Sequence, residues 1–217
     1  LFNSPNKTNT TIIFNYPKNI EIKEKLMKNI DIIYLGAVSE NRGIYIIFEV
    51  VSRLIKTYPN IKVEIIGQIP QLIKSDLEHE LKKKKLTHVI SLRGYIDYND
   101  ALDCLKRSKI GLCLLFPTKN YINSYPTKLF DYMIAGIPVV GTDIGYLGKI
   151  INEAECGYSV APNDIRGTVN VLNKLLSDDI NREKMGKNGL DYINKKYNWE
   201  TEEEKLLNLY SKLLLER

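Results

Sequence analysis

The chain has 217 residues, of which 44% are hydrophobic, so it can bury one sizeable core but not two ordinary domains and a linker. Its 31 basic and 26 acidic residues leave a net charge of only +5, and we expect no nucleic-acid partner from so small a bias. Much of that charge could come from the lysine tract at residues 82–85. Either a solvated helix face or a contact with anionic lipid or phosphate would explain the tract.

The three cysteines, Cys104, Cys113 and Cys156, are odd in number and widely spaced, which is typical of reduced core residues. No apolar run approaches the roughly 18 residues of a membrane span, and residues 1–5 lack the layout of a signal peptide. We therefore expect a cytoplasmic protein, with a peripheral membrane contact as an open alternative. Because the chain opens abruptly and without methionine, we also expect that an upstream part has been removed.

From residue 31 onward, short apolar runs alternate with segments of helical period, which predicts an α/β domain with a doubly wound parallel sheet. The expected strands are 32–35, 63–66, 89–92, 110–116, about 138–140, and 157–160. Helical patterns cover 44–55, 72–84, 97–106 and 127–135, and three further helices close the chain. Residues 1–30 are expected to form a leading segment and an interdomain connection, with 3–11 as a disordered or connecting piece.

In sheets of this class, ligands bind beyond the carboxyl ends of the strands, where helix N-termini present unpaired N–H groups to anions. The loops at 36–43, 67–70, 94–97 and 117–127 should therefore converge on one site. Common nucleotide signatures do not fit, because Gly141, Gly145 and Gly148 have the wrong spacing for G-x-G-x-x-G. Neither His79 nor His88 belongs to a metal-binding pattern, so no metal site is expected.

The most informative stretch is 123–140, which runs from Asn123 through Asp131 to the hexapeptide Ala-Gly-Ile-Pro-Val-Val at 135–140. It resembles the retaining glycosyltransferases of GT-B fold, which carry two acidic residues eight apart, an apolar helix and A-x-G-x-P-V-V. Asn123 and Asp131 stand at the two acidic positions. Further motifs at 15–17, 35–43, 65–67, 92–95 and 157–162 follow in the family's order, so the resemblance covers nearly all of 11–217.

The resemblance implies that residues 31–217 are the C-terminal, donor-binding half of a GT-B fold, with a Rossmann-like sheet. Such a half binds a nucleoside-diphosphate sugar, while a missing N-terminal domain of the same protein holds the acceptor. The complete enzyme would transfer the sugar with retention of configuration. The sugar nucleotide is then the donor substrate, and no cofactor is expected.

The residue types fit such a ligand. Gly36 lies in the loop that resembles the family's phosphate-binding first loop, and Arg42 on that loop could donate to a diphosphate as a fork. Thr127 and Lys128, at the expected start of a helix, would add backbone N–H groups and a positive charge. The alternatives are a surface role for Arg42 and an exposed side chain for Lys128.

Three residues would recognise the remainder of the donor. The carboxylate of Asp131 could accept hydrogen bonds from both ribose hydroxyls, unless it only faces solvent. Tyr95 resembles the family's base-contacting position, with a rim aromatic as the alternative. Asn123 would contact the transferred sugar, but its amide carries no charge to stabilise an oxocarbenium ion. The family's frequent Arg after the first Gly is also absent, since Ala37 stands there.

Two other kinds of function stay open. A sugar-nucleotide epimerase or hydrolase of the same fold would share the donor pocket without transferring to an acceptor. A catalytically silent nucleotide-binding or scaffold protein is suggested by Ala37 and Asn123.

Overall fold

The computed structural model describes residues 11–18 and 26–215. A parallel sheet of six strands, in the order β3-β2-β1-β4-β5-β6, forms the centre of the described chain. This arrangement confirms the predicted doubly wound sheet. Its strands are β1 (Ile30–Leu35), β2 (Val63–Ile66), β3 (Ile90–Gly94), β4 (Ser108–Cys113), β5 (Val139–Thr142) and β6 (Gly157–Val160).

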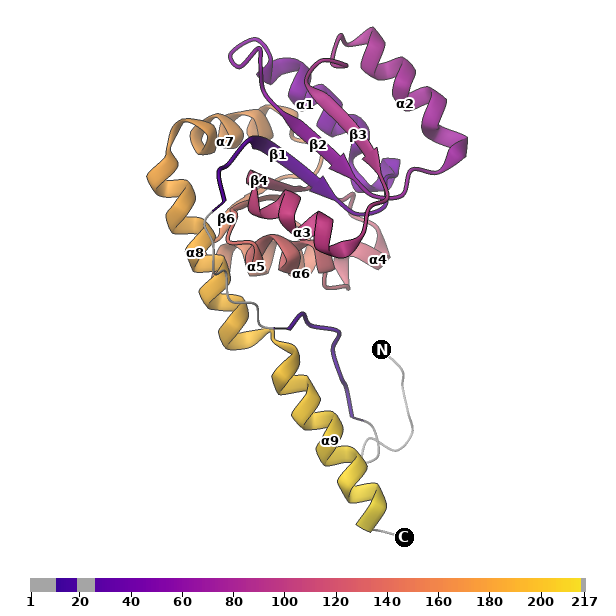
Figure 1. Cartoon of the computed structure of the whole chain (residues 1–217), viewed down its shortest axis with the longest axis vertical. Helices are drawn as coiled ribbons and strands as arrows, with labels where there is room; N and C mark the ends of the chain where they lie inside the picture. Colours follow the sequence, from indigo (N-terminus) through magenta and orange to yellow (C-terminus); the bar gives the residue numbers. More distant parts are fainter. Residues whose placement is uncertain (1–10, 19–25, 216–217) are drawn as a thin grey trace.

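Helices cover both faces of the sheet, as Figure 1 shows. On one face, α1 (Ile44–Leu54), α2 (Gln71–Lys83) and α7 (Ile165–Ser177) share a hydrophobic cluster with Ile32 and Tyr34 of β1. On the other face, α3 (Tyr98–Lys106), α5 (Thr127–Ile134), α6 (Gly145–Glu153) and α8 (Asp179–Lys196) pack around Ile33 and its neighbours. Alternate side chains of one central strand thus serve both cores, as a doubly covered parallel sheet requires.

The end of β4 and helix α6 are two of the features in the second half that differ from the sequence prediction. Strand β4 ends at Cys113 instead of Phe116, because it pairs with β5 only through Cys113 and the backbone then turns so that the Phe116 N–H donates to the Asn41 carbonyl (2.9 Å). Helix α6 was not predicted, since Gly145 and Gly148 lower its intrinsic helix propensity. Its buried stripe, which includes Leu147, Ile150 and Ile151, stabilises it against the sheet.

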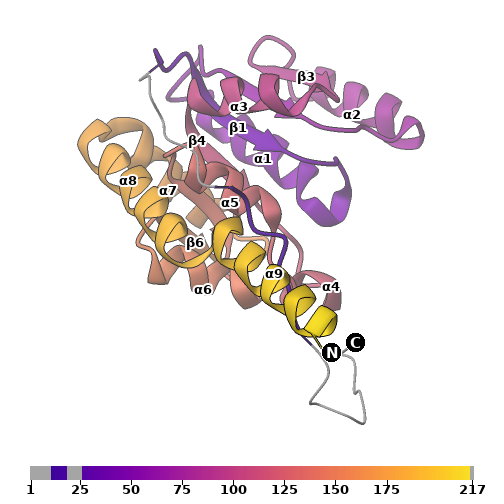
Figure 2. The ribbon, with the colours of Figure 1, turned by 60° about the horizontal axis from the view of Figure 1, so that its bottom comes forward.

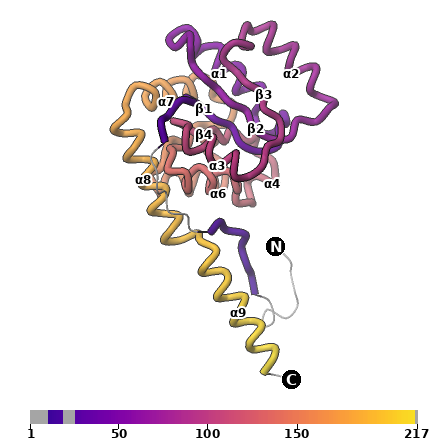
Figure 3. The backbone as a smooth tube through the Cα atoms, in the orientation of Figure 1, coloured from indigo at the N-terminus to yellow at the C-terminus, as the bar shows by residue number. Residues whose placement is uncertain are grey.

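The last helix, α9 (Trp199–Leu215), projects away from the sheet, and residues 11–18 run beside its first part (Figures 1 and 2). The Trp199 N–H donates to the Pro17 carbonyl (2.9 Å), and the Phe14 N–H donates to Glu202 (3.0 Å). The tube in Figure 3 shows how these two distant parts of the sequence meet below α8. Apart from Thr11, the expected connecting piece at 3–11 lies outside the described residues.

An aromatic cluster fixes this junction to the sheet domain. Tyr16 packs edge-on against Tyr125, Phe130 and Tyr197, with ring centroids 6.1, 5.7 and 5.1 Å away. Such pairs stabilise by roughly 0.5–1.5 kcal/mol each beyond the area they bury. Residues 11–18 are therefore held against the loop that leads into α5. Within the described residues, no helix combines the length and the apolar character needed to cross a membrane.

Candidate functional site

The candidate site lies where β1 and β4 end side by side at the centre of the sheet. The strand order reverses between these two neighbours, which is the place where open parallel sheets bind ligands. The loops that follow them touch closely: Gly43 has φ +79°, and a Cβ there would come within 2.2 Å of the Leu114 carbonyl oxygen. Only glycine fits this contact, so the β1 loop is fixed against the β4 loop.

Tyr132, on α5, joins the ends of β1 and β4 through its hydroxyl group. Its hydroxyl donates to the Leu112 carbonyl of β4 and accepts from the Leu35 N–H of β1, both at 2.9 Å. The ring fits because Gly111 leaves room for it, and a Cβ at that glycine would lie 2.6 Å from the ring. Tyr132 lies within the motif stretch 123–140, but the sequence alone did not indicate this role.

Lys128 is the most unusual side chain of the site. It is only 7% exposed, and its Nζ is buried without a hydrogen-bond partner in the part of the chain that the structure describes. The ammonium lies 3.8 Å from the centroid of the Tyr34 ring, and a Cβ on Gly36 would lie 3.4 Å from it. Burial lowers the pKa of Lys128 to about 8, with a further contribution from the nearby Arg42.

Arg42 lies at the other side of Gly36. A Cβ on that glycine would be 3.7 Å from Arg42 Nη1, so both cations converge on the left-handed Gly36 (φ +123°). The Arg42 Nε donates to the Tyr121 hydroxyl (3.1 Å), and Nη1 approaches the Ala37 carbonyl at 3.4 Å. The guanidinium is therefore half-buried and oriented by the protein, instead of lying free on the surface.

Asp131 follows Lys128 by three residues and faces the start of α3. The Tyr98 hydroxyl donates to Asp131 Oδ1 at 3.2 Å. Burial raises the pKa of Asp131 to about 6, while the hydrogen bond from Tyr98 and the charge of Lys128 act in the opposite direction. The alternative of a fully solvent-facing Asp131 is thus not what the structure shows, because the residue is only partly exposed.

Thr127 is the first residue of α5, and Pro126 precedes the helix as its N-cap with φ −75° and ψ 110°. The helix therefore begins at the residue that the sequence analysis expected. The first N–H groups of a helix have no intrahelical acceptors, so those of Thr127 and Lys128 are available to an anion. The helix N-terminus and the buried ammonium lie in the same first turn.

Two predicted site residues stand apart from this group. Asn123 is exposed at the C-cap of the short helix α4 (Lys119–Ile122), where its Nδ2 donates to the Lys119 carbonyl (3.1 Å). Tyr95, in the loop after β3, is 78% exposed and so is not packed as a rim aromatic. The structure thus brings together Gly36, Arg42, Lys128 and Asp131, with Thr127 in the same first turn of α5 as Lys128.

The site also contains residues that the sequence did not single out. Tyr34 supplies the aromatic face under Lys128, Tyr121 holds Arg42, and Tyr98 holds Asp131. Each of the three lies in or beside one of the loops that were expected to converge. No spacing rule separates them from the other tyrosines of the chain, of which there are 14 in all.

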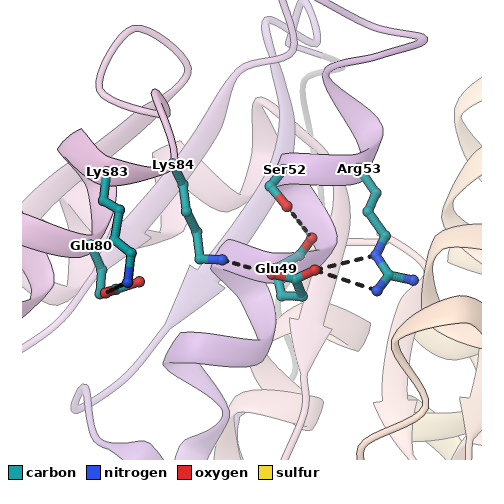
Figure 4. Close-up of polar contacts among 6 residues, drawn as sticks. All are labelled: Glu49, Ser52, Arg53, Glu80, Lys83 and Lys84. Atoms are coloured by element: carbon teal, nitrogen blue, oxygen red, sulfur yellow. Dashed lines mark hydrogen bonds and ion pairs between the residues drawn. The ribbon is translucent and has the colours of Figure 1, made fainter.

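The lysine tract at 82–85 lies far from these residues, on the end of α2. Figure 4 shows Lys84 reaching Glu49 of α1, with Nζ 2.7 Å from Oε2, and Lys83 paired with Glu80 at 3.2 Å. Glu49 also contacts Arg53 at 3.4 Å. Two lysines of the tract therefore take part in helix-surface ion pairs, one of which joins α2 to α1.

Comparisons with known proteins agree with this architecture. The glycogen synthase of Mycobacterium tuberculosis is 20% identical over 171 residues, which make up 79% of this chain and 40% of that protein. The crystal structure of a mutant of TarM from S. aureus, in complex with fondaparinux, alpha-GlcNAc-glycerol and UDP, gives a TM-score of 0.75 at 22% identity. That match covers 92% of this chain and 39% of the TarM chain.

A third match is the C-terminal domain of the glycosyl transferase group 1 family protein LpcC from Francisella tularensis. Its crystal structure gives a TM-score of 0.68 at 25% identity and covers 80% of this chain and 89% of that domain. The chain thus corresponds to a C-terminal domain of the GT-B fold and spans well under half of the glycogen synthase and of TarM. Residues 15–191 match the family described as glycosyl transferases group 1, and the chain belongs to that family.

Proposed function

We propose that this domain binds a nucleoside-diphosphate sugar, and that the whole protein transfers the sugar to an acceptor held by an N-terminal domain. The acceptor side of the cleft would belong to that other domain, which agrees with the 40% share of the glycogen synthase that this chain spans. Retention of configuration is part of the proposal and rests on the family resemblance. The UDP named with the TarM structure supports a nucleotide as the ligand class.

The observation that carries the proposal is the buried ammonium of Lys128, which has no hydrogen-bond partner among the described residues. A buried charge without a hydrogen bond is costly, and groups perturbed in this way cluster at functional sites. A diphosphate would supply the missing negative charge, and it would reach the Arg42 guanidinium and the α5 N-terminus from the same position. Because Ala37 replaces the Arg that the family often has there, Lys128 would provide the second cation of the site.

Each of the other site residues would contact a different part of the donor. Asp131 would accept from the ribose hydroxyls one turn along α5 from the diphosphate, and the exposed Tyr95 would contact the base. Asn123 would contact the transferred sugar after its α4 cap contact is exchanged. Gly36 would let the phosphates approach the backbone of the first loop, since a side chain there would meet Lys128.

A second candidate is a domain that binds the nucleotide without turnover. One observation favours it: Asn123 carries no charge, and its amide already donates a hydrogen bond to the Lys119 carbonyl. A site of this kind would keep the affinity for the donor but would lack electrostatic stabilisation of the sugar in the transition state. Donor hydrolysis and transfer by the full-length protein distinguish the two candidates.

Calorimetric titration with UDP, GDP and inorganic pyrophosphate tests the proposal directly. We expect the wild-type chain to bind at least one of the nucleotides, and Lys128→Met to bind it at least several-fold more weakly, because a charge-assisted bond contributes about 1.5–3 kcal/mol. Lys149→Met is the matched control, since Lys149 lies on α6 with a side chain that is 62% exposed. No binding by the wild type, or equal affinity in all three proteins, would contradict the proposal.

A further inference from the structure

Tyr98 is the first residue of α3 and connects this helix to α5 through a single polar contact. Its hydroxyl donates to Asp131 Oδ1 at 3.2 Å, although the residue as a whole is 52% exposed. The contact joins residues 33 positions apart in the sequence. An exposed tyrosine that is held to a partly buried carboxylate needs a reason beyond hydrophobic burial.

The surroundings of Asp131 show which groups act on its carboxyl. From α3 comes the Tyr98 hydroxyl, and from the preceding turn of α5 comes the charge of Lys128. The neighbouring Tyr132 hydroxyl is occupied by the two strand ends, and Asp131 raises its pKa further. Behind Lys128 lie Arg42 and the buried thiol of Cys113. Among these groups, the hydrogen bond to Asp131 that the structure shows comes from Tyr98.

We propose that Tyr98 is a positioning residue for ribose recognition: by donating to Oδ1, it keeps the Asp131 carboxylate ionised and turned so that its remaining lone pairs accept the ribose hydroxyls. This inference rests on the proposed function, because it assigns a specificity role within the same donor site. A carboxylate has about four acceptor positions on its two oxygens, so one tyrosine hydroxyl leaves room for a diol.

The chemistry of Tyr98 suits this role over the whole useful pH range. Burial raises its pKa to about 12, so the hydroxyl stays protonated and acts as a donor. A hydrogen bond donated to the ionised form favours that form and lowers the pKa of a carboxyl group. Without the Tyr98 hydroxyl, the pKa of Asp131 would rise above its value of about 6, and more of the residue would be protonated near neutral pH.

The test is Tyr98→Phe, which removes the hydroxyl that donates to Asp131 and leaves the ring. Two measurements follow: the pKa of Asp131 by carboxyl-carbon NMR in the free protein, and the pH dependence of binding to UDP-glucose and GDP-mannose. Sugar nucleotides are the right probes, because their phosphates do not titrate near neutral pH, whereas a terminal phosphate has a pKa of about 6. We expect both the pKa and the acidic midpoint of binding to rise by roughly one pH unit.

The specificity readout compares each ribonucleotide with its 2′-deoxy form. In Tyr98→Phe we expect the ribose preference near neutral pH to fall several-fold. The preference should recover at higher pH as Asp131 ionises, and the series ends near pH 8, where Lys128 begins to lose its charge. Pyrophosphate binding should stay the same. Tyr210→Phe is the matched control, because it removes a hydroxyl from a tyrosine of α9 that is 60% exposed and has no place in the site, and it should change neither the midpoint nor the preference.

The outcomes separate the two proposals. If the wild type binds neither sugar nucleotide, the proposed function and the ribose role fall together. If it binds normally but Tyr98→Phe leaves the acidic midpoint and the ribose preference unmoved, the donor site stands and the role of Tyr98 is overturned. A purely structural link between α3 and α5 would change the melting temperature without moving the pH profile.

Discussion

The Lys128 ammonium lies 3.8 Å from the centroid of the Tyr34 ring, so within residues 11–18 and 26–215 this buried cation packs on an aromatic face and not against a carboxylate. Cation–π contacts stabilise by about 2 kcal/mol when desolvated, which is less than burial of a charge costs. An ion pair would have neutralised Lys128, whereas the ring leaves its donors uncommitted. This pairing explains how the domain keeps a positive charge beneath Gly36.

Replacing Lys128 by Met should stabilise the free protein. The pKa of Lys128 falls from 10.5 to about 8 on folding, so the charged side chain costs roughly 3 kcal/mol below pH 8. Between these two pKa values the unfolded chain binds more protons, so the wild type gains stability as the pH rises. The advantage of Lys128→Met should therefore be largest near neutral pH and shrink toward the pKa of 10.5, as denaturant titrations would measure. A less stable variant would contradict this account.

Replacing Arg42 by Ala should weaken nucleoside-diphosphate binding at least several-fold. The guanidinium is already aligned by Tyr121 at 3.1 Å, so little ordering cost remains when it donates to a phosphate. Arg42→Lys should fall between the wild type and Arg42→Ala, because it keeps the charge but loses the fork. Calorimetry provides the affinities, with Arg53→Ala on α1 as the control. Unchanged affinity in Arg42→Ala would remove this residue from the site.

Replacing Asp131 by Ala should weaken ribonucleotides and leave pyrophosphate almost untouched, since only the diol loses its acceptor. In the wild type the raised pKa means that the carboxylate is present above about pH 6 and is lost as the pH falls through that value. The affinity for a sugar nucleotide such as UDP-glucose, whose phosphates do not titrate near pH 6, should decline over the same interval in the wild type but not in Asp131→Ala. Titrations of UDP-glucose at several pH values check this, and an equal loss of affinity for UDP-glucose and pyrophosphate in Asp131→Ala at one fixed pH would indicate a damaged α5.

The isolated chain should hold the donor without transferring its sugar. Transfer between two domains requires a closed cleft that excludes water and brings the acceptor to near-attack distance. In addition, Asn123 is neutral and offers no charge to stabilise an oxocarbenium ion. A transfer and hydrolysis assay on this chain and on the full-length protein decides the matter. Comparable rates for the two would overturn both the domain assignment and the proposed mechanism.

The fold could be predicted in outline from apolar runs, because buried parallel strands and amphipathic helices leave clear patterns. Strand β6 (Gly157–Val160) was expected with the bounds that it has, and α5 begins at Thr127 as expected. Helix α6 was missed because Gly145 and Gly148 resemble loop residues. The strand predicted at 110–116 extended past the observed end of β4, because Leu114 and Leu115 continue the apolar run and are buried beyond the paired part of the strand.

The candidate site could be predicted as a set of converging loops, but its electrostatics could not. Lysine is rarely buried, so nothing in the sequence around Lys128 distinguished a buried ammonium from an exposed one. The ring of Tyr34 covers this ammonium, and Tyr34 belongs to a strand that lies 94 positions before Lys128 in the sequence. The contact between Tyr98 and Asp131 likewise depends on how α3 lies against α5, and this is a property of packing.

The junction between residues 11–18 and the start of α9 has an optical consequence. Trp199 is the chain's only tryptophan, and its backbone N–H donates a hydrogen bond to the Pro17 carbonyl at 2.9 Å. Indole emission therefore reports on this junction alone, whereas far-ultraviolet circular dichroism reports on all the helices and strands. Transitions that coincide for the two probes would indicate one cooperative unit. An earlier change in emission would measure how far the junction melts before the sheet, without any attached label.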